Sequence, residues 1–86
     1  MKKKRKVMVY ALSTCVWCKR AKRLLNDLGV PYDCIDIDML SGEEEQETRE
    51  IVDRLNPDGS FPVIVIDNKK VISGFDEDRI RQALDL

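Results

Sequence analysis

The sequence predicts a single three-layer α/β domain, in which helices cover both faces of a four-stranded mixed sheet. Its 86 residues are enough for one domain and too few for two, so residues 1–86 form one unit. Apolar segments and helical patterns follow one another in the order strand–helix–strand–helix–strand–strand–helix. A helix separates the first two strands, which should therefore be parallel, whereas a short turn joins the last two into an antiparallel hairpin.

The first third of the chain supplies the opening strand and helix. Residues 7–12 form a short apolar run, which is typical of a strand covered on both faces. Ser13 and Thr14 offer hydroxyl groups that can cap a helix over residues 15–28, which Gly29 ends. The apolar stripe of this helix consists of Cys18, Ala21, Leu24, Leu25 and Leu28.

The middle of the chain adds a strand, a helix and a second strand. Residues 32–38 alternate in part between polar and apolar, which indicates a strand. Residues 41–44 have the spacing of a capping box and open a helix that ends before Asn56. Residues 62–66 are a continuous apolar run, as in a central strand.

The last third of the chain completes the sheet and adds a helix. Residues 67–69 make a turn into a hairpin partner at residues 71–72. Residues 74–76 then introduce a helix that Asp76 can cap. The buried side of this helix consists of Ile80, Ala83 and Leu84.

The charge balance and hydropathy of the chain exclude some classes of function. The chain has 15 basic and 16 acidic residues, without the basic excess of a dedicated nucleic-acid binder. No apolar run approaches the roughly 20 residues of a membrane span, and no signal-peptide pattern is present. We therefore expect a soluble, cytoplasmic monomer that binds neither nucleic acid nor membrane.

The opening residues 1–6 are strongly basic. Such a run can be a nuclear import signal or a phosphate-binding patch. It can also be a solvated leader in front of the strand that begins at Val7. Since the rest of the chain has no nuclear or nucleic-acid-binding feature, we interpret it as a leader.

The cysteines carry the functional signal. Cys15 and Cys18 are three residues apart where a strand meets a helix, and the chain has no histidine. Unpaired N–H groups and the dipole at the helix N-terminus favour a thiolate at Cys15, and Lys19 and Lys22 add positive charge. Cys18 lies one turn on, at the edge of the buried stripe. Cys15 is thus the predicted nucleophile, and Cys18 the predicted resolving thiol.

A zinc site is the alternative for a C-x-x-C pair. It would need Cys34 and a fourth ligand, because histidine is absent. Cys34 falls inside an apolar strand, where we expect a small buried side chain. A C-x-x-C pair at a strand-to-helix junction favours redox chemistry, and no metal ligand is assigned.

Two further features adjoin the predicted active site. Trp17, in the first helical turn, is expected to form an exposed lip beside Cys15. Pro62 begins an apolar strand, which proline tolerates there. The alternative is a cis Phe61–Pro62 bond that turns the backbone of Phe61 toward the thiols.

From Val7 onward, the chain resembles the glutaredoxin branch of the thioredoxin superfamily over nearly its whole length. The matching segments are residues 14–19, 32–38, 61–63 and 73–76. The resemblance implies a thioredoxin fold with sheet order 2-1-3-4 and a cis Pro62. It also implies a substrate groove formed by Trp17, Phe61, Pro62, Gly74, Phe75 and Asp76.

The implied function is thiol–disulfide exchange without a bound cofactor. Cys15 would attack a substrate disulfide or a glutathione mixed disulfide, and Cys18 would resolve it, passing electrons to protein targets. Glutathione-dependent members often have lysine where this chain has Leu12. Ser73 and Gly74 are more similar to the glutaredoxin-like electron donors of ribonucleotide reductase. The reductant is therefore glutathione or a flavin-linked thioredoxin reductase, and a zinc or glutathione-bridged iron–sulfur module is the alternative function.

Overall fold

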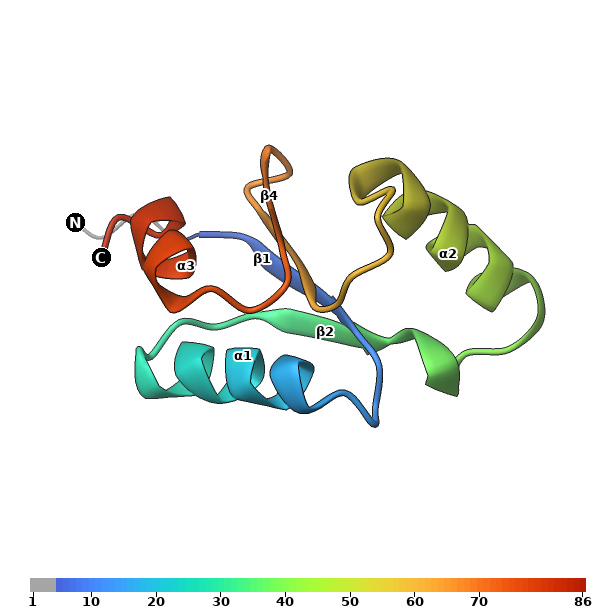
Figure 1. Ribbon diagram of the computed structural model, residues 1–86, viewed down its shortest axis with the longest axis horizontal. Helices are drawn as coiled ribbons and strands as arrows, with labels where there is room; N and C mark the ends of the chain where they lie inside the picture. The colour runs from blue at the N-terminus through green and yellow to red at the C-terminus, as the bar shows by residue number, and fades with distance from the viewer. Residues whose placement is uncertain (1–4) are drawn as a thin grey trace.

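The computed structural model describes residues 5–86 and confirms the predicted order of elements (Figure 1). Residues 1–4, most of the predicted basic leader, lie outside the described part. The strands are β1 (Val7–Ala11), β2 (Asp33–Asp36), β3 (Val63–Ile66) and β4 (Lys70–Ser73). The helices are α1 (Val16–Asp27), α2 (Gly42–Leu55) and α3 (Glu77–Ala83), with a 3-10 turn, η1 (Ile37–Met39), after β2.

The sheet has the order β2-β1-β3-β4, as the resemblance implied. β1 is parallel to β2 and antiparallel to β3, and β3 is antiparallel to β4. Val9, in the middle of β1, pairs with Cys34 on one side and Ile64 on the other. The peptide bond between Phe61 and Pro62, directly before β3, is cis. The predicted parallel pair and hairpin are therefore both confirmed.

Two apolar clusters cover the two faces of the sheet and make the three layers. α1 and α3 pack on one face, and α2 packs on the other, which separates α2 from the other helices in Figure 1. Side chains of β1 alternate between the faces, since Val9 belongs to the first cluster and Tyr10 packs against the second. The first cluster contains Val7, Val9, Ala11, Cys18, Ala21, Leu24, Leu25, Ile64, Ile66, Ile72, Ile80, Ala83 and Leu84.

The start of α1 differs from the prediction. The N-cap is Cys15, whose Sγ accepts the Cys18 N–H, so neither Ser13 nor Thr14 caps the helix. A thiol can do this because its sulfur is a weak acceptor. At the other end Gly29 has a φ of +69°, a left-handed conformation that glycine adopts without strain.

Two other segments differ from the sequence-based expectation. The strand predicted over residues 32–38 is shorter, because β2 ends at Asp36 and the chain then turns to bury Ile37 against Val52 of α2. The cap of α2 is at Ser41 as predicted, but its side chain makes no capping hydrogen bond.

The described end of the basic segment is not simply solvated. Arg5 pairs with Asp67 in the β3–β4 turn at 2.9 Å and with Asp85 near the C-terminus. It therefore fastens the start of β1 to two segments distant in sequence.

Candidate active site

Cys15 lies where β1 hands over to α1. Its N–H donates to the Leu12 carbonyl at 3.1 Å, and its carbonyl accepts the Lys19 N–H at 3.1 Å. Its sulfur accepts the Cys18 N–H at 3.2 Å, and the residue is partly exposed. A backbone N–H is thus already directed at this sulfur, which is the arrangement that stabilises negative charge there.

Cys18 has the opposite environment, one turn further along α1. Its side chain is fully buried in the first apolar cluster. Burial raises the pKa of the Cys18 thiol to about 12, aided by its hydrogen bond with Cys15. The Leu12 backbone and the Lys22 charge oppose that rise. At neutral pH the Cys18 thiol of the reduced protein is therefore protonated.

The two lysines predicted beside the thiols are placed differently. Lys19 is exposed on α1. The Lys22 ammonium is half-buried and pairs with Asp36 of β2, with Nζ 3.0 Å from Oδ1. Lys22 is therefore anchored on the Cys18 side of the helix.

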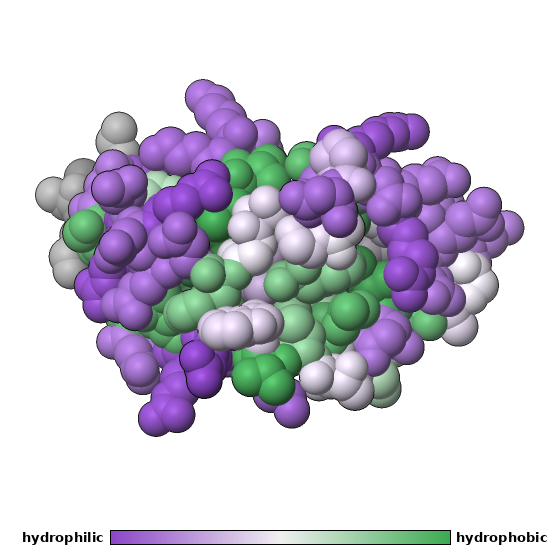
Figure 2. Space-filling view, viewed as in Figure 1, coloured by the Kyte–Doolittle hydropathy of each residue, from purple (hydrophilic) through white to green (hydrophobic). Residues whose placement is uncertain are grey.

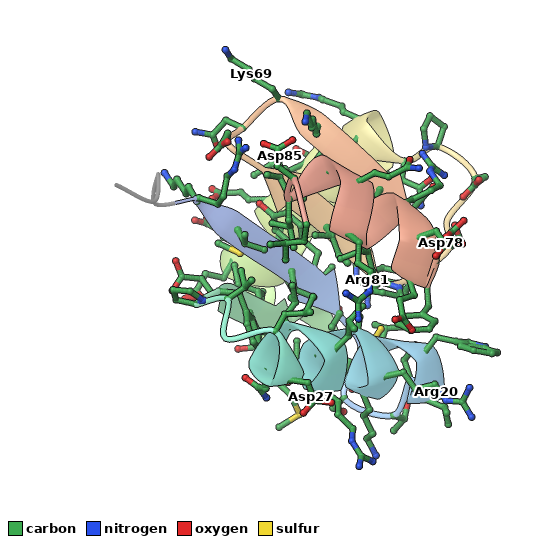
Figure 3. The ribbon with its side chains drawn as sticks, turned by 90° about the vertical axis from the view of Figure 1, so that its left-hand side faces the viewer. Arg20, Asp27, Lys69, Asp78, Arg81 and Asp85 are labelled. Carbon is green, nitrogen blue, oxygen red and sulfur yellow. The ribbon has the colours of Figure 1, made fainter. Side chains whose placement is uncertain are left out.

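An aromatic pair forms one border of the site. Trp17 is 52% exposed, and its ring stacks on that of Phe75 with centroids 6.0 Å apart and planes inclined by 22°. The Arg20 guanidinium lies 4.8 Å from the Trp17 ring centroid, a cation–π contact that sequence reasoning missed. Figure 3 shows Arg20 projecting outward from α1. Trp17 is thus exposed in the first turn of α1, as predicted, and Phe75 stacks on it.

The segments before β3 and after β4 approach each other beside the thiols. The Gly74 N–H donates to the Pro62 carbonyl at 2.8 Å, and Gly74 has a φ of +77° that favours glycine. Phe61 is half-buried and, like Cys15 and Phe75, packs against the first cluster. The Asp76 carboxylate caps α3 by accepting the Arg79 N–H at 3.1 Å.

Apolar side chains gather around this site. In the space-filling view, pale and green residues occupy the middle of one face and hydrophilic residues flank them on both sides (Figure 2). The exposed side chains of Val16 and Trp17 and the partly buried Phe61 and Phe75 belong to the segments that meet at Cys15. Cys15, Phe61 and Phe75 thus pack against the cluster that contains Cys18, whereas Lys22 pairs with Asp36 of β2.

Two contacts near the site involve residues that sequence reasoning misassigned or overlooked. Asp38 of η1 accepts hydrogen bonds from the Ser13 hydroxyl and from the Ser13 N–H, the latter at 2.8 Å. These bonds lower the pKa of Asp38 and tie the loop before Cys15 to η1. Cys34, expected to be buried, is exposed because β2 is an edge strand. Packing close to its sulfur nevertheless raises the pKa of Cys34, against the effect of Lys22.

Other features lie apart from the thiols. A hollow of about 480 Å³ between the C-terminal ends of α1 and α3 is lined by Arg5, Leu28, Gly29, Val30, Leu84, Asp85 and Leu86. Within residues 5–86, no three acidic or cysteine side chains gather as metal ligands. No helix in the described part of the chain is long and apolar enough to span a membrane.

Several of the proteins to which the chain is similar are glutaredoxins. The glutaredoxin family model matches residues 7–71. The crystal structure of the glutaredoxin from Methanosarcina mazei Go1 is 52% identical, with a TM-score of 0.87 over 94% of this chain and 79% of that one. Methanosarcina acetivorans methanoredoxin is 46% identical, with a TM-score of 0.88 over 94% and 85%. Glutaredoxin 1 of Rickettsia prowazekii is 31% identical over 76% of this chain and 65% of its own length.

Proposed function

Because the chain belongs to the glutaredoxin family of thiol–disulfide oxidoreductases, we propose that it is a dithiol reductase of disulfides in protein targets. Cys15 attacks the substrate disulfide and forms a mixed disulfide with it. Cys18 then attacks the Cys15 sulfur, releases the reduced substrate and leaves a Cys15–Cys18 disulfide. The observation that carries this proposal is the contrast between the two thiols: Cys15 is accessible with an N–H directed at its sulfur, and Cys18 is buried and protonated.

The surroundings of the thiols support a bound, extended substrate. A disulfide approaching Cys15 would meet Phe75, which stacks on Trp17, and Phe61, since both pack against the same cluster as Cys15. Apolar side chains on the substrate gain from covering this surface. We assign the substrate groove to Trp17, Phe61, Pro62, Gly74, Phe75 and Asp76.

Two single substitutions test the roles of the cysteines. Cys15→Ser should abolish reduction of a disulfide-bonded protein, because it removes the attacking sulfur. Cys18→Ser should retain the first attack and accumulate a covalent mixed disulfide, because the resolving sulfur is gone. Non-reducing electrophoresis and intact mass measure the adduct. Equal trapping by the two variants would contradict the assigned roles, and Cys34→Ser serves as the control.

The electron source is the second part of the proposal. Glutaredoxins use glutathione, whose two carboxylates are served by a cation near the nucleophile. Leu12 is apolar and packs against the second cluster, and the predicted cation Lys22 is engaged by Asp36. We therefore favour reduction of the Cys15–Cys18 disulfide by a flavin-linked thioredoxin reductase, with weaker use of glutathione. A reducing compartment such as the cytoplasm suits this cycle, since the dithiol is the active form.

A further inference from the structure

Lys22 has a defined position on α1, about one turn after Cys18 and about two turns after Cys15. It follows Cys18 by four residues, so both side chains lie on the same face of α1. Its Nζ is held 3.0 Å from Asp36 Oδ1, and both side chains are largely covered, with exposed fractions of 25% and 31%. The ammonium is therefore restrained at the end of the cluster that contains Cys18.

The pairing of β1 with β2 fixes the position of Asp36 relative to Cys18. Asp36 pairs with Ala11 in the register of β2 and β1, one residue before Leu12. The Leu12 backbone interacts with the Cys18 thiol in the sense that favours its ionised form. Asp36, at the end of β2, and the Cys18 thiol, near the end of β1, thus lie at the same end of the sheet.

Among the described residues, Cys15 and Lys22 are the charged groups that shift the pKa of Cys18. The side chains that β1, β3, β4 and α3 add to its cluster are all apolar. On α3, Arg81 lies on the side of α1 (Figure 3) and is paired with Glu77 at 3.0 Å. On β2, Cys34 contacts Asp36, with Sγ 3.9 Å from Oδ1.

We propose that Lys22, held by Asp36, is a positioning residue that favours ionisation of Cys18 during resolution of the mixed disulfide. This inference rests on the proposed function. It reassigns Lys22 from the nucleophile, where the sequence placed it, to the resolving thiol.

Mixed-disulfide formation increases the relative weight of Lys22 among the effects on the Cys18 pKa. Burial and two effects of Cys15, its hydrogen bond and its charge, raise the pKa of Cys18 in the reduced protein. Once Cys15 is bonded to the substrate, its sulfur carries neither a proton nor a charge. Burial then still raises the pKa of Cys18, whereas the Leu12 backbone and the Lys22 charge lower it. Partial burial lowers the pKa of Lys22, but the hydrogen bonds that its ammonium group donates to Asp36 and Cys34 raise it by more, so Lys22 remains an ammonium ion.

The resolving step balances without another reactant. The Cys18 thiol loses its proton, and the thiolate attacks the Cys15 sulfur. The bond between Cys15 and the substrate sulfur breaks as the Cys15–Cys18 bond forms, and the substrate leaves as a thiolate that takes up a proton. Lys22 stabilises charge on Cys18 and transfers no proton.

Dithiobis(nitrobenzoate) separates attack from resolution. Each of the two steps releases one coloured thiolate, so stopped-flow absorbance of the reduced protein with one equivalent of reagent gives two phases. A Cys34→Ser background removes the third thiol. Lys22→Met keeps the apolar stem and removes the charge, Lys22→Arg keeps the charge, and Arg23→Met removes an exposed charge one residue away as the matched control.

Lys22→Met should leave the first phase unchanged and slow the second about three- to tenfold at neutral pH. The second-phase rate should reach the parent's at alkaline pH, where Cys18 ionises without help. Lys22→Arg should restore it, and Arg23→Met should leave both phases unchanged. Lys22→Gln repeats the test if the Met variant is poorly folded.

An unchanged second phase, or equal slowing of both phases, would overturn the role of Lys22. Equal slowing by Arg23→Met would overturn it too, since the effect would then be one of general charge. A first phase that survives Cys15→Ser would instead contradict the proposed function itself. The two failures are therefore distinguishable.

Discussion

The Cys18 thiol is kept protonated by its packing, and this has a cost for the folded state at high pH. Its pKa rises to about 12 in the folded protein, from a value of 9.0 for the free group. Unfolding therefore releases a proton between these pH values. The stabilisation is complete below about pH 9 and is lost as the pH rises toward 12.

Replacing Cys18 should flatten this pH dependence. Above about pH 9, the parent's free energy of unfolding should fall more steeply than that of Cys18→Ala, by about 1 kcal/mol per pH unit. Urea denaturation of both proteins under reducing conditions over a pH series measures the difference. Ionisation of the tyrosines and lysines is common to both chains and cancels. Parallel profiles would show that the Cys18 thiol is not perturbed in the folded protein.

At the level of elements, the proposed nucleophile Cys15 is also the residue that caps α1 at its junction with β1. Because Cys15 is the N-cap, the same sulfur that reacts also satisfies a backbone N–H of α1. The loop before it is fixed by Leu12, whose carbonyl accepts the Cys15 N–H, and by the bonds from Ser13 to Asp38. Residues in this loop therefore influence the site through position as well as through charge.

A substitution at Leu12, in this loop, tests the proposed electron source. Leu12→Lys should raise glutathione-linked turnover, because an ammonium group there can pair with a glutathione carboxylate. Leu12→Met is the matched control, since it preserves apolar packing without a charge. Turnover with glutathione plus glutathione reductase, compared with thioredoxin reductase, provides the measurement. Efficient glutathione turnover in the parent, with no gain in the lysine variant, would contradict the favoured electron source.

For the molecule as a whole, the order of elements could be predicted from the sequence, because the apolar pattern that marks each helix or strand lies within that element's own residues. The continuous run of β3 and the stripe of α1 both correspond to observed buried surfaces. The extent of β2 was not predictable in this way. In the described part of the chain, β2 pairs only with β1 at the edge of the sheet, and burial of Ile37 under α2 ends it after Asp36.

The family resemblance was enough to predict the cis bond between Phe61 and Pro62. It also indicated that the turn at Gly74 lies near this bond, where the Gly74 N–H donates to the Pro62 carbonyl. The sequence could not predict the contacts between Lys22 and Asp36 or between Ser13 and Asp38. Both join residues distant in the chain and depend on how η1 and β2 pack. Exposure of Cys34 has the same origin, since only the sheet order makes β2 an edge.

The rate of alkylation of each cysteine tests the division of labour between the thiols most directly. The fully reduced protein is treated with limiting iodoacetamide at neutral pH, quenched at intervals, and digested for peptide mass spectrometry. Cys15 should be labelled first, and Cys18 should stay unlabelled until the protein is unfolded, because its sulfur is buried and protonated. Labelling of Cys18 in the folded protein as fast as Cys15 would contradict the assignment of nucleophile and resolving thiol.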